Sequence, residues 1–383
     1  MNNSASTAVC NWLAAHRGEM LELLEAAVNI DSGSSHKQGV DRMAALMESF
    51  LGSSGLHTQR HPLTDHGDCV SAKMAGSMGN EHVLLLGHMD TVFPVGTAKR
   101  RPFRVEGEIA YGPGVADMKA GLVMHAFVAR AFAEIAPGNV PIQLLFTGDE
   151  EVASPSSRQI ILEKASGAKA VFNAEPGRPS GNVVTARKGA FFIDFEVKGV
   201  AAHAGVAPEK GASAIEALAQ KVVELHQLND RSVGLSANVG TIRGGMTVNT
   251  VADHAQAQLD VRFPGNLDHE ELHDKILRII CRKSVCNTHA HVTGEGLFLP
   301  LLVTEAGQQL LEKYQKNAKK LDMKVEGEST GGSADSGLTS SVGAPTLCAT
   351  GPIGGDVHTD REWLRVNSIL PRAQAMALTI LDL

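Results

Sequence analysis

Six side chains of the kinds that bind divalent metals or transfer protons are spread along most of this sequence. Each one follows an apolar segment or lies in a glycine-rich loop: His88, Asp117, Glu150, Glu151, Glu175 and His358. Imidazole and carboxylate ligands without thiolates suit a catalytic site that keeps one coordination position open, and zinc, cobalt and manganese all accept such ligands. We therefore expect the fold to gather these residues into one pocket that holds two metal ions, with zinc as the first choice.

Each residue also has a purely structural explanation when it is considered alone. A His-x-Asp sequence such as His88-Met89-Asp90 is common in solvated turns, and Asp117 stands where a helix N-cap is expected, although a carboxylate there could also bridge two cations. Glu150-Glu151 is either a solvated acidic turn or a pair that faces opposite sides of an extended strand, with one carboxylate on the metal and the other free as a general base. Both explanations stay open at this point.

Apolar segments place these residues at the ends of strands. The expected strands and the residues that follow them are 83–86 with His88, 141–147 with Glu150-Glu151, and 168–174 with Glu175. Helices are expected around 18–29, 40–51 and 118–134. We expect a loop to carry His88. Because open α/β sheets form their sites beyond the carboxyl ends of the strands, one crevice could collect all of these side chains.

The pattern changes from about residue 189, where alternating strands and two helices follow one another. Strands are expected at 191–197, 238–242 and 254–263, and helices at 212–228 and 267–281. This is a β-α-β-β-α-β arrangement of antiparallel type. We therefore expect three segments: a catalytic domain begun by residues 1–188, an inserted domain at 189–293, and a return to the catalytic domain at 294–383.

Composition limits the possible partners and compartments. The 383 residues exceed what one core usually serves, so two domains are expected. A net charge of -7 argues against nucleic acid or an anionic membrane as partner. Five cysteines, an odd number without a C-x-x-C pair, favour a reducing compartment, and neither a signal peptide nor a membrane span is apparent. We expect a soluble, cytoplasmic protein.

Seven short motifs, in this order, resemble one family. They are Gly87-His88-Met89-Asp90-Thr91-Val92, the segment from Gly112 to Gly121, Thr147-Gly148-Asp149-Glu150-Glu151, Glu175-Pro176, Ala202-His203-Ala204-Gly205, Gly331-Gly332-Ser333-Ala334-Asp335 and His358-Thr359. The chain is similar to the aminoacylase/carboxypeptidase family of co-catalytic zinc exopeptidases, and the spacing favours its glutamate carboxypeptidase-like members. The resemblance covers nearly the whole chain. It implies an α/β catalytic domain, with a mixed sheet and helices on both faces, and an inserted ferredoxin-like lid and dimerisation domain.

The resemblance also implies roles for individual residues. The metal ligands would be His88, Asp117, Glu151, Glu175 and His358. Glu150 would be the general base, Asp90 would orient His88, and the peptide bond between Asp117 and Met118 would be cis. His203 would reach from the lid into the site of the partner subunit of a homodimer and stabilise the oxyanion. Substrate contacts would come from Arg262, Asn249 and Gly332.

The expected reaction is metal-dependent hydrolysis of an amide bond, either release of a C-terminal amino acid or deacylation of a small N-acyl amino acid. A substrate carboxylate needs a cation, for which Arg262 is the first candidate and Arg187, Lys188 and Arg243 are others. Where relatives carry an arginine after the lid, this chain has Thr293-Gly294-Glu295-Gly296-Leu297, and a glutamate there would repel a carboxylate. Hydrolysis of a non-peptide C–N bond and a non-catalytic role therefore remain alternatives. A serine hydrolase is disfavoured because no Gly-x-Ser-x-Gly sequence occurs.

Overall fold

The computed structural model describes residues 3–74, 81–138 and 140–383. The chain forms two compact units, and the second is inserted into the first. The first unit is made of Met1–Ala186, Leu301–Thr330 and Ala334–Leu383, and the second of Arg187–Pro300 and Gly331–Ser333. The boundary expected at residue 293 falls inside a strand, His289–Phe298, so the inserted segment extends further along the chain than the sequence pattern indicated.

The first unit is built on a six-stranded mixed sheet. Its strands, in spatial order, are β1 (Leu56–His61), β2 (Cys69–Met74), β6 (Ile142–Thr147), β3 (His82–His88), β7 (Ala168–Asn173) and β14 (Thr346–Leu347). The four strands from β6 to β14 are parallel, whereas β1 and β2 are antiparallel to their neighbours. The carboxyl ends of β3, β6 and β7 therefore meet at one edge.

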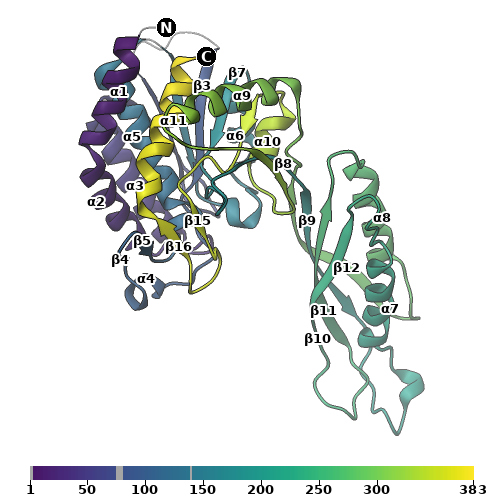
Figure 1. The fold of residues 1–383 in the computed structure, drawn as a ribbon. Helices are drawn as coiled ribbons and strands as arrows, with labels where there is room; N and C mark the ends of the chain where they lie inside the picture. The colour runs from purple at the N-terminus through teal and green to yellow at the C-terminus, as the bar shows by residue number, and fades with distance from the viewer. Residues whose placement is uncertain (1–2, 75–80, 139) are drawn as a thin grey trace. The chain divides into compact units, whose positions relative to one another are not determined.

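The central strand β3 is covered on both faces. Val83 and Leu85 belong to the main core with residues of the long helix α5, while Leu84 and Leu86 are fully buried on the other side. Helices lie on both faces of the sheet (Figure 1). The helices of this unit are α1 (Asn3–Ala15), α2 (Arg17–Val28), α3 (Lys37–Ser53), α4 (Thr97–Arg100), α5 (Ala120–Ile135), α6 (Arg158–Ala165), α9 (Glu305–Lys319), α10 (Ser336–Ser341) and α11 (Ile369–Leu381). The α/β class expected from the sequence is confirmed.

A small second sheet pairs strands of the first unit that precede the inserted unit in the sequence with strands that follow it. Its strands, in spatial order, are β15 (Gly354–Gly355), β16 (Trp363–Arg365), β5 (Ile109–Tyr111) and β4 (Arg104–Glu106), all antiparallel. β5 leads into the glycine-rich loop before Asp117, and β16 follows His358. A further pair, β8 (Val183–Arg187) and β13 (Gly327–Thr330), lies apart from both sheets. Segments far apart in the sequence thus meet next to the expected metal ligands.

The second unit has the expected β-α-β-β-α-β order. Its elements are β9 (Gly189–Lys198), α7 (Ala214–His226), β10 (Ser236–Gly244), β11 (His254–Phe263), α8 (His269–Cys281) and β12 (His289–Phe298). The strands form an antiparallel sheet in the order β10-β11-β9-β12, which is the ferredoxin-like order. Alternate residues of β9 and β11 pack under the two helices, so the opposite face of the sheet is polar.

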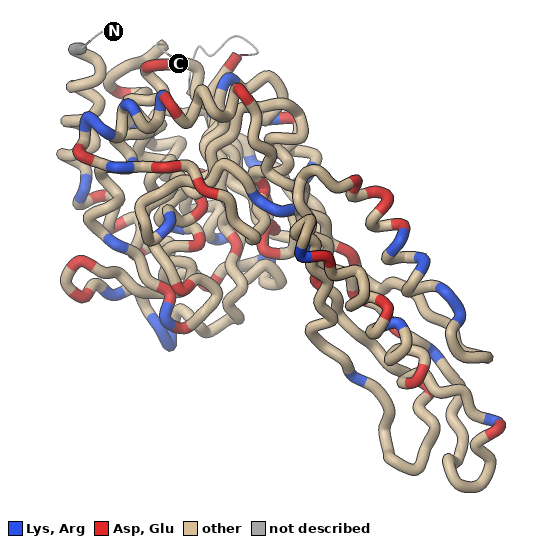
Figure 2. Tube along the Cα trace, turned by 45° about the vertical axis from the view of Figure 1, so that its right-hand side comes forward, with Lys and Arg blue, Asp and Glu red and all other residues tan. Residues whose placement is uncertain are grey.

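Acidic and basic residues are interspersed along the chain in both units (Figure 2). This distribution accords with the net charge of -7. Across residues 3–74, 81–138 and 140–383, no helix is long and apolar enough to cross a lipid bilayer.

Candidate metal centre

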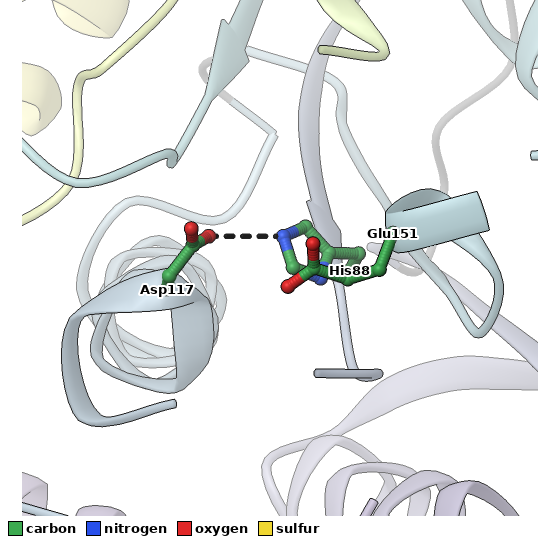
Figure 3. Close-up of side chains that lie close together, drawn as sticks. All are labelled: His88, Asp117 and Glu151. Atoms are coloured by element: carbon green, nitrogen blue, oxygen red, sulfur yellow. Dashed lines mark hydrogen bonds and ion pairs between the residues drawn. The ribbon is translucent and has the colours of Figure 1, made fainter. Parts of the chain in front are cut away.

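Two imidazoles lie on either side of one carboxylate in the first unit. His88 has its Nε2 atom 3.2 Å from Oδ1 of Asp117, and His358 has its Nε2 atom 3.3 Å from Oδ2 of the same residue. His88 is the last residue of β3, not part of a loop as expected. Figure 3 shows His88 and Asp117 facing each other, with Glu151 beside them. Asp117 therefore offers one oxygen to each imidazole.

Three glutamates complete the cluster. Oε2 of Glu151 lies 3.2 Å from Nε2 of His358. Nε2 of His88 lies 3.7 Å from Oε1 of Glu175 and 3.9 Å from Oε2 of Glu150. The side chains of Glu150 and Glu151 are only 9% and 7% exposed, which excludes a solvated acidic turn. All six residues that the sequence singled out thus lie together.

The buried carboxylate of Asp90 holds two parts of this cluster. Its Oδ1 and Oδ2 accept hydrogen bonds from the backbone N–H groups of Glu150 and Glu151, each at 3.1 Å. The Ser34 hydroxyl donates to Oδ2 at 2.7 Å. Nδ1 of His88 lies 3.0 Å from the backbone oxygen of Asp90 and 3.4 Å from Oδ1. Asp90 therefore contacts both the His88 ring and the turn that carries the two glutamates.

That turn is a short 3-10 segment, Glu150–Val152, and not the extended strand that the sequence suggested. Ala153 and Ser154 follow it with φ of 71° and 52°, a left-handed conformation that is uncommon for residues with side chains. Buried hydrogen bonds maintain it: the Ser154 hydroxyl donates to Asp335 at 2.5 Å, and Asp149 accepts from two backbone N–H groups. The positions of the two glutamates are consequently set by contacts from distant segments.

Asp117 lies in a turn of irregular backbone before α5. The helix begins at Ala120, and its N-cap position is occupied by Lys119 without a side-chain capping bond, so the N-cap explanation of Asp117 is wrong. Asp117 has φ of -111° and ψ of 94°, and its peptide bond to Met118 is cis. The cis geometry that the resemblance implied is confirmed. The carboxylate is left to face the two imidazoles.

Proximity changes the acid–base properties of the cluster. Burial disfavours the charged form of His88, but the charge of Glu150 and hydrogen bonds to Asp117 and Asp90 outweigh it and raise the pKa of His88. Hydrogen bonds to Asp117 and Glu151 raise the pKa of His358 to about 10. Burial is the main cause that raises the pKa of Glu150 and of Glu151. Without metal, the cluster therefore retains protons that a bound cation would replace.

The residues present fit a divalent metal. Oε1 of Glu151 is buried and has no hydrogen-bond partner in the part of the chain that the structure describes. Four carboxylates lie around two imidazoles, and buried carboxylates repel one another unless a cation or a proton lies between them. Two sets of ligand-type atoms lie within 4.8 Å of one another: His88 with Asp117 and Glu151, and His88 with Glu150 and Glu175. Their oxygen and nitrogen donors suit a catalytic metal centre.

Comparison with known proteins places this cluster in a family. The sequence profile described as Peptidase family M20/M25/M40 matches residues 84–382, which include all six residues of the cluster. The chain belongs to this family. It is therefore a metal-dependent hydrolase of amide bonds, and the resemblance stated from the sequence motifs is confirmed.

Individual relatives of this M20 family member support the assignment. Carboxypeptidase G2 of a Pseudomonas species is 29% identical over 372 residues, which are 95% of this chain and 89% of that protein. Acetylornithine deacetylase of Proteus mirabilis is 27% identical over 67% of this chain and 71% of its own length. An M20 family metallo-carboxypeptidase of Sulfolobus solfataricus shares the fold, with a TM-score of 0.77 at 18% identity, covering 95% of this chain and 98% of that one.

The expected substrate and oxyanion residues of this M20 chain lie in its second unit. Arg262 of β11 is held on both sides: Asp260 accepts two hydrogen bonds at 2.8 Å, and the guanidinium lies over the Phe192 ring at 5.0 Å. The exposed loop residues His203 and Asn249 are close in the fold, because the backbone of Ala204 donates to Asn249 at 2.9 Å. The carbonyl of Gly332 accepts a hydrogen bond from Arg187 at 3.2 Å.

Glu295 lies on the face of the sheet that the two helices cover. A register shift between Val292 and Gly294 places Glu295 opposite Ile193, whose side chain packs under the helices. Its carboxylate meets His273 of α8 at 3.3 Å. Arg262 is on the polar face of the sheet, since its neighbours Val261 and Phe263 are in the core under the helices. Glu295 and Arg262 therefore lie on opposite faces of this sheet, and the repulsion of a substrate carboxylate by Glu295 stays a prediction.

Several residues that build the centre were not given a role from the sequence. Asp335 and Asp149 lie within quoted motifs, and their position beside the glutamate turn could have been suspected. Ser34 and Glu362 carried no such signal. Glu362 is 1% exposed and accepts hydrogen bonds from the backbone of Gly114, Ala116 and Asp117, contacts that only the folded chain reveals.

Proposed function

We propose that this protein is a two-metal amidohydrolase that uses zinc, or else cobalt or manganese, to cleave amides of small substrates. His88 and Glu175 would hold one ion, His358 and Glu151 the other, and Asp117 would bridge them. The observation that carries the proposal is the position of Asp117, whose two oxygens face the two imidazoles at 3.2 and 3.3 Å. A shared carboxylate between two open sites is the arrangement expected of a co-catalytic pair.

The remaining carboxylate of the cluster, Glu150, is proposed as the general base. When bound, divalent metal ions activate a water molecule and polarise the scissile carbonyl. Glu150 accepts the proton of the attacking water, and the same carboxyl then delivers it to the leaving nitrogen. Burial is the main cause that raises the pKa of Glu150, which favours its holding the proton between these two steps.

The proposed substrates carry a free carboxylate next to the scissile amide, as in N-acyl amino acids and peptides with a free C-terminus. Two of the named relatives, carboxypeptidase G2 and an acetylornithine deacetylase, support this class. Arg262 is the proposed anchor, since Asp260 and Phe192 hold its guanidinium in one orientation. Glu295 contacts His273 on the face of the sheet opposite to Arg262, so we do not expect it to repel a carboxylate that Arg262 binds.

A homodimer is proposed for the complete site. The tip of the second unit exposes apolar side chains: Val206 is 78% exposed, Met246 88% and Val248 103%. These residues flank the loops of His203 and Asn249, and exposed apolar groups of this kind are typical of protein interfaces. We propose that His203 enters the partner's site and donates a hydrogen bond to the oxyanion, while Asn249 and Gly332 contact substrate.

A reducing compartment, the cytoplasm, is proposed from the cysteines. All five are free: Cys10, Cys69, Cys281, Cys286 and Cys348. In an oxidising compartment, exposed thiols such as Cys281 and Cys286 would be at risk of disulfide formation.

A hydrolysis screen tests the proposed function. Zinc-loaded protein is incubated with N-acyl amino acids, dipeptides and matched amides that lack the carboxylate, and products are followed by mass spectrometry. The Glu150→Gln variant serves as the blank. Cleavage that requires the free carboxylate supports the proposal. Cleavage of only the uncharged amides would refute the substrate class, and no cleavage of any substrate would refute the function.

A further inference from the structure

Glu362 is a buried carboxylate next to the metal centre that belongs to neither set of candidate ligands. It is 1% exposed and lies four residues after His358. The ligand-type clusters found among the described residues do not include it. A carboxylate excluded from solvent is costly unless hydrogen bonds or a cation compensate it, so its partners indicate its purpose.

Three backbone N–H groups of one loop converge on Glu362. Oε2 accepts from Gly114 at 2.9 Å, and Oε1 accepts from Ala116 at 2.9 Å and from Asp117 at 3.0 Å. Consecutive N–H groups that point at one place form a concave anion site. In this chain the anion is the side chain of Glu362, so the loop is closed by a group of the protein itself.

The small sheet determines where Glu362 stands. β16 pairs with β5 so that Trp363 lies opposite Tyr111. Glu362 immediately precedes β16, and the loop that carries Asp117 immediately follows β5. The pairing of β5 with β16, two strands that are far apart in the sequence, therefore places the Glu362 carboxylate next to the backbone N–H groups of this loop.

We propose that Glu362 is the positioning residue for the bridging carboxylate Asp117, and through it for both metal ions. One of its three hydrogen bonds comes from the N–H of Asp117 itself, and the other two hold the residues before it. Because Asp117 faces both imidazoles, a shift of its backbone changes the geometry of both ions at once. This inference rests on the proposed function, in which Asp117 bridges two metals.

Metal titration of the full-length protein tests the inference. Metal-free protein is titrated with Zn²⁺ against a chromogenic chelator, and with Co²⁺ while its visible absorption spectrum is recorded. Glu362→Gln has nearly the same shape, but its one amide oxygen can accept from Ala116 and Asp117 or from Gly114 and not from all three, because its NH₂ group cannot accept a hydrogen bond. We expect about a 10- to 100-fold loss of affinity, the range found when outer partners of metal ligands are removed, together with a changed Co²⁺ spectrum.

Two further variants make the test specific. Glu328→Gln is the matched control, because Glu328 accepts its hydrogen bonds from Arg178 and Asn182, which are not part of the centre. It is expected to keep wild-type affinity and spectrum. Glu362→Asp retains the charge with a shorter reach and is expected to recover part of the affinity. It also replaces Glu362→Gln if that variant does not fold.

The outcomes separate this inference from the proposed function. If the wild-type protein binds neither Zn²⁺ nor Co²⁺, the proposed function fails and this inference fails with it. If the wild type binds two ions and Glu362→Gln binds them with equal affinity and an unchanged spectrum, only the inference is overturned. A lower unfolding midpoint alone, without a change in metal affinity, would likewise mean that Glu362 only stabilises the fold.

Discussion

Replacing Asp90 by asparagine should damage stability and metal binding together. The substitution keeps the shape of the side chain but replaces one acceptor oxygen by an NH₂ group. If the remaining oxygen still accepts the hydrogen bonds of the Glu151 N–H group and the Ser34 hydroxyl, the N–H group of Glu150 loses its acceptor. A hydrogen bond to a charged group contributes about 1.5–3 kcal/mol, and a buried N–H without an acceptor costs about 1–3 kcal/mol. Because the cost of an N–H group without an acceptor already includes the lost hydrogen bond, we expect the free energy of unfolding to fall by roughly 1–3 kcal/mol.

The same change releases the turn of the two glutamates and the ring of His88. We expect the affinity for Zn²⁺ to fall about 10- to 100-fold. Urea unfolding of the metal-free protein measures the first effect, and titration against a chelator measures the second. Asp65→Asn, at an exposed carboxylate, is the control and should change neither quantity. An Asp90→Asn protein with full stability and full metal affinity would refute the role of Asp90 argued from its hydrogen bonds.

Three other predictions follow from the same structure. Glu150→Gln should keep its metal content but lose about 10²- to 10⁴-fold in kcat, and more than a tenth of wild-type activity would exclude Glu150 as the base. Because the pKa of His358 is raised to about 10 and that of His88 is raised too, Zn²⁺ binding should release protons and become tighter as the pH rises. Calorimetry at pH 7 in two buffers of different ionisation enthalpy should therefore give different apparent heats of binding. Equal heats in the two buffers would contradict this prediction. Burial lowers the pKa of His125 from 6.5 to about 3, so its contribution to stability is present above pH 6.5 and is lost as pH falls towards 3. As the pH falls from 8 to 5, the free energy of unfolding of His125→Leu, measured with urea, should rise by ~2 kcal/mol relative to that of the wild type. The control variant at an exposed histidine, His57→Gln, should show no such relative rise. An equal pH dependence for the wild type and His125→Leu would refute the prediction.

Four of the ligand-type residues could be found from the sequence because each follows a simple apolar run: His88, Glu150, Glu151 and Glu175. The strands before His88, Glu150 and Glu175 are buried on both faces, and buried parallel strands are visible as continuous apolar segments. Once those strands are parallel neighbours, their carboxyl ends meet. The grouping of these four residues therefore depends on a pattern that is local in sequence and on one general rule of sheet geometry.

The hydrogen bonds that hold the ligand-type residues in place could not be predicted, because they join residues that are far apart in the sequence. The hydrogen bonds of Glu362 to the Asp117 loop join residues 245 to 248 positions apart, and Asp90 holds the Glu150 turn across 60 positions. The 3-10 turn at Glu150 was expected as a strand end for the same reason. The face on which Glu295 lies could not be predicted either, because a single register shift in β12 moves its side chain to the other face of the sheet.

The interleaved order of the two units has a consequence for how the protein is made. All six elements of the second unit, β9 to β12, leave the ribosome before β14, His358 and β16, which complete the first unit. Chains are synthesised from the N-terminus, so the inserted unit can fold while the larger one is still incomplete. During that interval the edge of β7 that later pairs with β14 is unpaired, and an unpaired strand edge can associate with the strand of another chain. In the proposed two-metal site, the ion that His358 would hold can therefore bind only after nearly the entire chain has been synthesised.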